Sequence, residues 1–143
     1  MDTAEYIGIL EAERSFIGIM GVILLGLYIL FVVLTLLGLT RARTGKEKLW
    51  HFIIITLFAI IIGTMNVIGI SDLSYDIENE AFIVYEGEFE FSHDYRDDYS
   101  VSFTYSGADY SLSTDDYFFE DGVYRGRVIF SERSKIVLEI IIE

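Results

Sequence analysis

The residues best suited to chemistry in this chain lie in the acidic stretch SHDYRDDYS, which contains His93. Asp94 and Asp97 flank the imidazole, and a histidine beside carboxylates is a pattern that general acid–base catalysis uses. A lone histidine among acids in a loop is more often a solvated residue. Cysteine is absent, which excludes thiol catalysis and cysteine-ligated zinc, and no GxSxG, HExxH or Walker-type motif occurs. We therefore expect a protein that is not an enzyme.

A second acidic stretch, TDDYFFEDG, adds carboxylates of the kind that hard cations prefer as ligands. Neither stretch has the spacing of an EF-hand, so our interpretation is solvated loops with no metal and no cofactor. Calcium bound at the acidic loops remains the alternative. The carboxylates concerned are Asp94, Asp97, Asp98, Asp115, Asp116, Glu120 and Asp121.

Tyrosine side chains are concentrated in the second half of the chain, where eight of the ten lie after residue 71. Tyrosine and arginine offer a large contact area together with hydrogen-bonding groups, and both are enriched where proteins bind proteins. The two acidic stretches therefore predict a surface for a protein partner. The alternative is that these aromatic rings fold back over the ends of the domain. The candidate partner-binding residues are Tyr95, Arg96, Asp97, Asp98, Tyr99, Asp115, Asp116 and Tyr117.

Charge is distributed unevenly along the chain, whose formal net charge is −13. Residues 1–70 hold five acids and five bases, whereas residues 71–143 hold 18 acids and five bases. The acidic half favours a partner with a basic surface and disfavours nucleic acid.

Two uncharged apolar segments precede the acidic half: Phe16 to Leu39, with 24 residues, and Phe52 to Ile70, with 19. A helix rises about 1.5 Å per residue, so roughly 20 apolar residues cross a hydrocarbon core of ~30 Å. A chain of 143 residues is too short to enclose two such helices in a soluble core. The start of the chain is acidic and the first apolar run is too long for a cleaved signal peptide. We predict two membrane spans.

The segment TRARTGKEK between the apolar segments carries four bases and one acid. Lys and Arg near span ends collect on the cytoplasmic side, and aromatic residues anchor the interface. The pattern predicts a cytoplasmic loop, both chain termini outside the cytoplasm, and a multi-pass protein of the cell membrane. The residues that indicate this topology are Arg41, Arg43, Lys46, Lys48 and Trp50.

Small and polar residues within the apolar segments predict how the spans assemble. Glycines allow helices to approach closely, and polar side chains form hydrogen bonds between helices. No ionisable residue lies inside the spans, which disfavours an ion or proton pathway. Homo- or hetero-oligomers through these helices are the basis of the alternative function, a structural subunit of a membrane complex. The candidate helix-packing residues are Gly18, Gly21, Gly26, Tyr28, Gly63, Thr64 and Asn66.

From Ala81 the sequence alternates between apolar and polar residues, beginning with AFIVYEGEFEFS, which is typical of half-buried strands. Gly87 interrupts the inner face of that strand and indicates a bulge or a coiled strand. In the last strand Ile136, Leu138, Ile140 and Ile142 are expected to face inward. The pattern predicts a small five-stranded antiparallel β barrel of OB-like or SH3-like type, with an open or sandwich-like sheet as the alternative.

The expected protein is thus an α+β membrane protein in which a two-helix transmembrane hairpin precedes a β domain. Its expected function is to present an acidic, tyrosine-rich extracytoplasmic module that binds a protein partner, in an immunity or neutralising role or as an accessory subunit. The expected segments are an N-terminal extracytoplasmic segment 1–15, spans 16–39 and 49–70 joined by the cytoplasmic loop 40–48, a linker 71–80, and the β domain 81–143.

Overall fold

The computed structural model describes residues 2–37, 45–93, 99–114 and 116–143, with the side chain of Lys48 outside that description. The chain divides into two compact units, each described by itself below. One unit is Ala12–Ser71, and the other combines Met1–Glu11 with Asp72–Glu143.

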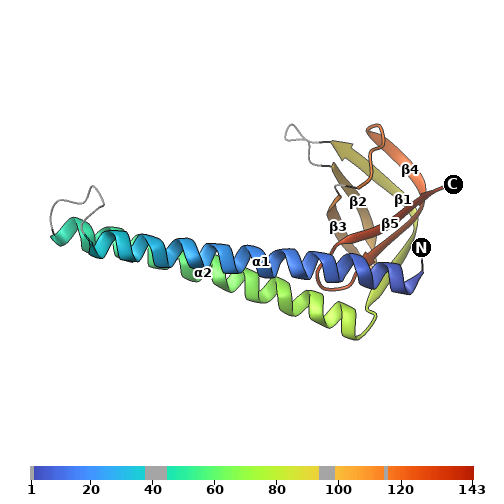
Figure 1. The fold of residues 1–143 in the computed structure, drawn as a ribbon. Coiled ribbons are helices and arrows are strands. Elements are labelled where there is room, and N and C mark those ends of the chain that lie inside the picture. Colours follow the sequence, from blue (N-terminus) through green and yellow to red (C-terminus); the bar gives the residue numbers. More distant parts are fainter. Residues whose placement is uncertain (1, 38–44, 94–98, 115) are drawn as a thin grey trace. The chain divides into compact units, whose positions relative to one another are not determined.

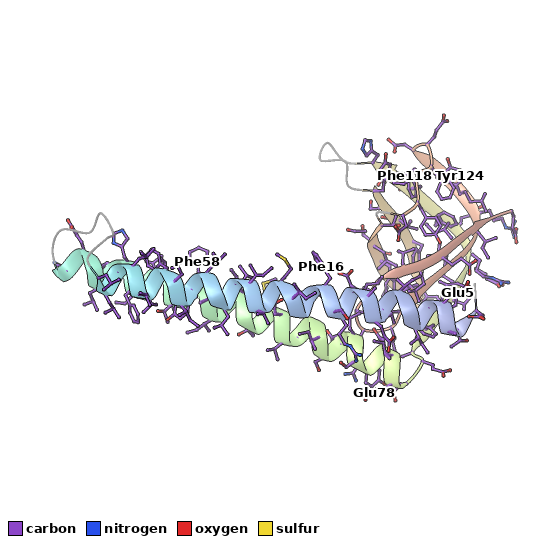
Figure 2. The ribbon with its side chains drawn as sticks, viewed as in Figure 1. Glu5, Phe16, Phe58, Glu78, Phe118 and Tyr124 are labelled. Atoms are coloured by element: carbon purple, nitrogen blue, oxygen red, sulfur yellow. The ribbon has the colours of Figure 1, made fainter. Side chains whose placement is uncertain are left out.

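The first unit is a helical hairpin made from the middle parts of α1 (Thr3–Leu36) and α2 (Gly45–Glu78), shown in Figure 1. Each helix has 34 residues, so each is about 50 Å long and exceeds the ~30 Å of a hydrocarbon core. Large apolar side chains such as Phe16 and Phe58 are exposed (Figure 2). Both helices are long and apolar enough to cross a membrane, and the most apolar stretch of each is not buried within the structure.

Local sequence sets the outer ends of both helices. Asp2 and Glu5 cap α1 reciprocally: the Glu5 backbone N–H donates to Asp2 Oδ1 at 3.0 Å, and the Asp2 N–H donates to Glu5 Oε2 at 2.9 Å. At the end of α2, Glu80 has a φ of 47° and the Ala81 N–H donates back to the Asp76 carbonyl at 2.9 Å. This is the hydrogen-bonding pattern of a Schellman motif, which ends a helix and turns the chain.

The second unit contains a five-stranded antiparallel sheet in the order β3-β2-β1-β4-β5 (Figure 1). The predicted α+β class and five antiparallel strands are confirmed. Within the described residues no ladder of hydrogen bonds joins β3 to β5, so the sheet is open and the expected closure into a barrel is not confirmed. The strands are β1 (Phe82–His93), β2 (Tyr99–Tyr105), β3 (Ala108–Thr114), β4 (Gly122–Ser131) and β5 (Val137–Ile142).

The hydrophobic core lies on the face of the sheet that the alternation predicts. Phe89 and Phe91 of β1 and Phe130 of β4 are almost completely buried, and they pack with inward residues of β2 and β3. The prediction for β5 is partly wrong. A register shift opposite Ile129/Phe130 pairs Phe130 with Val137, which brings Val137 into the core cluster. Ile142, the last residue of β5, is exposed.

Gly87 does not mark a bulge, because β1 and β4 pair without interruption from Phe82↔Ser131 to Phe91↔Gly122. It lies opposite Gly126 instead. A Cβ on Gly126 would be 2.0 Å from the carbonyl oxygen of Ile141 in β5, so only glycine fits where β5 crosses this point of β4.

The outer ends of both helices belong to the unit that contains the sheet. Leu10 of α1 and Leu73 of α2 are at most 1% exposed, and the Tyr6 ring meets Phe82 edge-on with centroids 5.5 Å apart. The segments 1–15 and 71–80, expected to be an extracytoplasmic N-terminal segment and a linker, are helical through most of their length. Burial of Tyr6, Leu10 and Leu73 within the unit that contains the sheet stabilises these helical extensions.

Two polar contacts attach these helix ends to the sheet. The Tyr6 hydroxyl donates a hydrogen bond to Glu139 of β5. Burial, followed by this hydrogen bond and the nearby negative charge, raises the pKa of Tyr6 to about 12, and the same bond lowers the pKa of Glu139. At the other helix end, the buried carboxylate of Asp76 accepts hydrogen bonds from the β4–β5 turn, and the Arg133 guanidinium lies over the Tyr75 ring at 3.4 Å.

Candidate functional site

One end of the sheet collects the residues that the sequence suggests for partner binding. The end of β1 pairs with the start of β2 at His93↔Tyr99, and Tyr99 also pairs with Thr114 at the end of β3. The start of β4 pairs with the end of β1 at Gly122, so the segment 116–121 leads into the same end. We call this region the loop end.

Three aromatic rings contact one another in sequence at the loop end. The His93 ring stacks on the Tyr99 ring with centroids 4.6 Å apart, and Phe118 meets Tyr99 edge-on at 5.1 Å. The backbone N–H of His93 donates to Asp121 Oδ1 at 2.8 Å, which fixes the segment beside the end of β1. We call His93, Tyr99 and Phe118 the aromatic tip.

Phe118 is the projecting member of the tip because its two neighbours turn inward. Phe119 meets the buried Phe91 edge-on at 5.2 Å, and Tyr117 packs against the core cluster. Phe118 between them is 69% exposed, and Figure 2 shows it at the same end of the sheet as Tyr124. An exposed phenyl ring held by packed neighbours is a typical anchor of a protein interface.

Tyr117 forms hydrogen bonds with the backbone of β5 at the open edge of the sheet. Its hydroxyl donates to the Leu138 carbonyl of β5 at 3.2 Å and also interacts with the Ile140 backbone amide. Burial is the main cause that raises the pKa of this phenol. The hydroxyl thus covers edge groups of β5 that no neighbouring strand pairs within the described residues, which limits the tendency of a free edge to bind other strands.

Carboxylates surround the aromatic tip. Asp116, Glu120 and Asp121 are all exposed and belong to the segment that carries Phe118. Two basic side chains of β4, Arg125 and Arg127, lie on the polar face of that strand, where Arg127 pairs with Glu86 at 2.6 Å. The loop end therefore presents an aromatic centre with an acidic margin, which suits a partner that offers cations around an apolar spot.

The predicted binding residues are distributed unequally in the structure. Tyr99 lies at the loop end as the first residue of β2, and Asp116 belongs to the segment that leads into this end. The hydroxyl of Tyr117 is turned toward β5. Phe118 was not among the candidates, because the consecutive aromatic residues YFF carry no alternation that separates an exposed ring from its packed neighbours. The other candidates, Tyr95, Arg96, Asp97, Asp98 and Asp115, lie outside the described residues.

Within the described ranges, no group of three acidic or histidine side chains is placed to hold a metal ion. Asp94, Asp97 and Asp98, with Asp115, which carried much of the calcium alternative, lie outside those ranges.

The residues predicted to set the topology lie at the far ends of the hairpin helices or beyond them. Lys46 and Trp50 are exposed on the first turns of α2. Arg41, Arg43 and the side chain of Lys48 lie outside the description.

Five of the seven candidate helix-packing residues line a groove in the hairpin. The groove has a volume of about 580 Å³, and its walls include Gly18, Gly21, Tyr28, Gly63 and Asn66. A Cβ on Gly18 or Gly63 would meet no heavy atom within 4 Å, so these two glycines contribute space to the groove.

The contacts of Tyr28 and the positions of the two candidates outside the groove, Thr64 and Gly26, are as follows. The Tyr28 hydroxyl forms its hydrogen bond with Thr56 at 3.2 Å. Thr64 is exposed outside the groove and donates to its own helix at the Ile60 carbonyl, at 2.8 Å. A Cβ on Gly26 would also have open space, but Gly26 does not line the groove.

Comparison of the chain with protein-family models, curated proteins and solved structures gave no match.

Proposed function

We propose that this chain is a two-span membrane protein that presents its acidic β unit outside the cytoplasm and binds there a protein partner with a basic surface. The observation that carries the proposal is the aromatic tip, in which Phe118 is 69% exposed yet held in place by packed neighbours. An ordered aromatic anchor loses little conformational entropy on binding, so its burial favours association.

Charge supports the nature of the partner. The acids of residues 71–143 outnumber the bases by 18 to five, and those beside Phe118 are exposed. Such a surface attracts a basic protein over several ångströms and accelerates its association at low salt. The same field repels nucleic acid and anionic lipid head groups.

A binding role is proposed in preference to catalysis because His93, the residue of the loop end best suited to acid–base chemistry, is packed within the aromatic tip. The His93 ring stacks on Tyr99, and its backbone is held by Asp121. The imidazole therefore forms part of the packed aromatic platform.

The proposed membrane topology is supported by the lengths of α1 and α2 and by the bases between them in the sequence. Two single-cysteine variants test it, since the chain has no cysteine of its own. A membrane-impermeant maleimide added to intact cells should label Ser106→Cys, in the β2–β3 turn, and should leave Gly45→Cys unlabelled until the cells are lysed. Labelling of Gly45→Cys in intact cells would contradict the topology.

The partner surface is tested by photo-crosslinking in the native membrane. A photoreactive phenylalanine analogue at position 118 should give an adduct with a protein that has a basic surface. The matched control is the same analogue at Val84, which is 48% exposed on β1. Equal adducts at both positions, or none at position 118, would refute the proposal.

The charge component is tested on the partner that the crosslink identifies. Asp116→Asn combined with Glu120→Gln should slow its association, and added salt should remove the difference between this variant and the wild type. The control, Glu78→Gln with Glu132→Gln, removes the same charge from exposed positions elsewhere.

The groove in the hairpin favours a second function, namely assembly through the helices as a structural subunit. Its walls come from both helices and are almost wholly apolar. Deleting the loop end while keeping both helices would retain this function and would abolish partner capture.

A further inference from the structure

The hairpin groove presents both a hollow and a polar group that is only partly satisfied. Gly18 and Gly63 face the hollow, where a Cβ on either would meet no heavy atom within 4 Å. Inside a bilayer such a hollow is filled by a lipid chain or by another helix, and small residues favour the helix because they let backbones approach.

The polar side chain of Asn66 favours a helix over a lipid chain as the occupant of the groove. It lines the groove, and its Oδ1 would be 3.9 Å from a Cβ on Gly21 across the helix pair. Its Nδ2 donates to the Ile62 carbonyl of its own helix at 3.0 Å. A carboxamide has a second N–H and an acceptor oxygen, and in the described part of the chain no donor reaches that oxygen. Unpaired polar atoms are strongly disfavoured in hydrocarbon, so the occupant should supply a donor and an acceptor.

We propose that the groove is the interface of a homodimer in which the Asn66 side chains of two copies form hydrogen bonds with each other. The inference rests on the proposed membrane insertion. Copies that insert in the same direction are related by a two-fold axis along the membrane normal, so equivalent residues lie at the same depth. A carboxamide is both donor and acceptor and therefore complements its own copy. An acyl chain offers neither group.

The test uses the full chain in vesicles of phosphatidylcholine and phosphatidylglycerol. Donor and acceptor dyes are attached to Ser106→Cys, and energy transfer is followed as the vesicles are diluted with lipid. The wild type should show transfer that decreases on dilution with a single dimer dissociation constant. Asn66→Leu should weaken the dimer by about 3- to 30-fold, the range for hydrogen bonds between membrane helices, while Asn66→Gln keeps both groups and should weaken it less. The control, Thr64→Val, removes a polar group outside the groove and should leave the dimer unchanged.

A second pair of variants tests the hollow without changing any polar group. Gly18→Ile fills the groove and should prevent dimer formation by occupying the space of the second copy. Gly26→Ile is the matched control, because Gly26 is also in open space on α1 but does not line the groove.

The inference would be overturned if the wild type stayed monomeric at every lipid ratio, as it would when a lipid fills the groove. It would also be overturned if Asn66→Leu and Thr64→Val changed the dimer dissociation constant equally. Equal changes of that constant in Gly18→Ile and Gly26→Ile would overturn it as well. Maleimide labelling in the same vesicles reports insertion independently. Failure to insert would therefore be distinguished from failure to dimerise.

Discussion

The carboxylate of Asp76 accepts two hydrogen bonds from Ser134, one from its backbone N–H and one from its hydroxyl, each at 2.7 Å. Asp76 lies near the end of α2 and is completely buried, whereas Ser134 lies in the β4–β5 turn. The N–H of Arg133 adds a third bond at 3.0 Å. The side chain of Asp76 on α2 therefore supplies a hydrogen-bond acceptor for backbone N–H groups of the β4–β5 turn.

Replacing this acceptor should loosen the turn. We expect Asp76→Ala to lower the free energy of unfolding of the sheet unit by about 3 kcal/mol, because two part-buried backbone N–H groups lose their carboxylate partner. Hydrogen exchange at Arg133 and Ser134 measures the loss at the site itself. Glu78→Gln removes a charge from an exposed position on the same helix and should leave this exchange unchanged.

Tyr6 should titrate at unusually high pH. Its pKa of about 12 lies above the usual 10.0, so its contribution to stability is complete below pH 10.0 and is lost as the pH rises through about 12. The pKa of Glu139 is lowered, so its contribution is present above 4.5 and is lost as the pH falls through the lower value of the folded state.

The absorbance difference between wild type and Tyr6→Phe isolates the titration of the Tyr6 phenol. Glu139→Gln should lower its midpoint, and burial should still hold it above 10.0. A wild-type midpoint at 10.0 would show that the contact does not persist in solution.

The close passage of β5 over β4 predicts a steep cost for one methyl group. Gly126→Ala should destabilise the sheet by at least about 2 kcal/mol, because the new Cβ would be 2.0 Å from a backbone oxygen that cannot move without shifting β5. Gly122→Ala is the matched control on the same strand, since its Cβ would lie 3.8 Å from the Tyr124 ring. Similar melting temperatures for the two variants would contradict this account.

The free edge of β5 should bind other strands more readily when the Tyr117 hydroxyl is removed. Tyr117→Phe should cost about 1 kcal/mol, accelerate hydrogen exchange at Ile140 and promote association through the β5 edge. Tyr105→Phe serves as the control, because the Tyr105 hydroxyl has no hydrogen-bond partner among the residues that the structure describes. If both variants behave alike, Tyr117 does not protect the edge.

The alternation of apolar residues was sufficient to predict the strands and most of the core. It identified Phe89, Phe91 and Phe130 correctly, and in β1 the alternation is clear because polar residues flank both phenylalanines. It failed in β5, where apolar residues occupy both faces and the register shift opposite Phe130 changes which of them face the core. A bulge of this kind depends on the partner strand, which the alternation of a single strand does not reveal.

In the helix extensions and at the loop end, too, some features could be predicted from the sequence and others could not. Tyr6 and Leu10 have the four-residue spacing of a buried helix face, so α1 could have been extended from sequence. The role of Asp76 could not, since its partners lie 57 and 58 residues away. At the loop end, the prediction from charged and tyrosine residues named Tyr99 and Asp116 and did not name the exposed Phe118.

The contact between Tyr6 and Glu139 joins residues 133 positions apart. During synthesis the first helical turns emerge long before the strand that they will touch, so the sheet unit reaches its final form only after nearly the whole chain has left the ribosome. Until then Leu10 and Leu73 lack the apolar surroundings that bury them in the folded unit. For the same reason, a soluble fragment that starts at Ala81 would lack part of its own core, and a fragment suitable for expression would need residues 2–11 and 72–80 grafted onto the sheet.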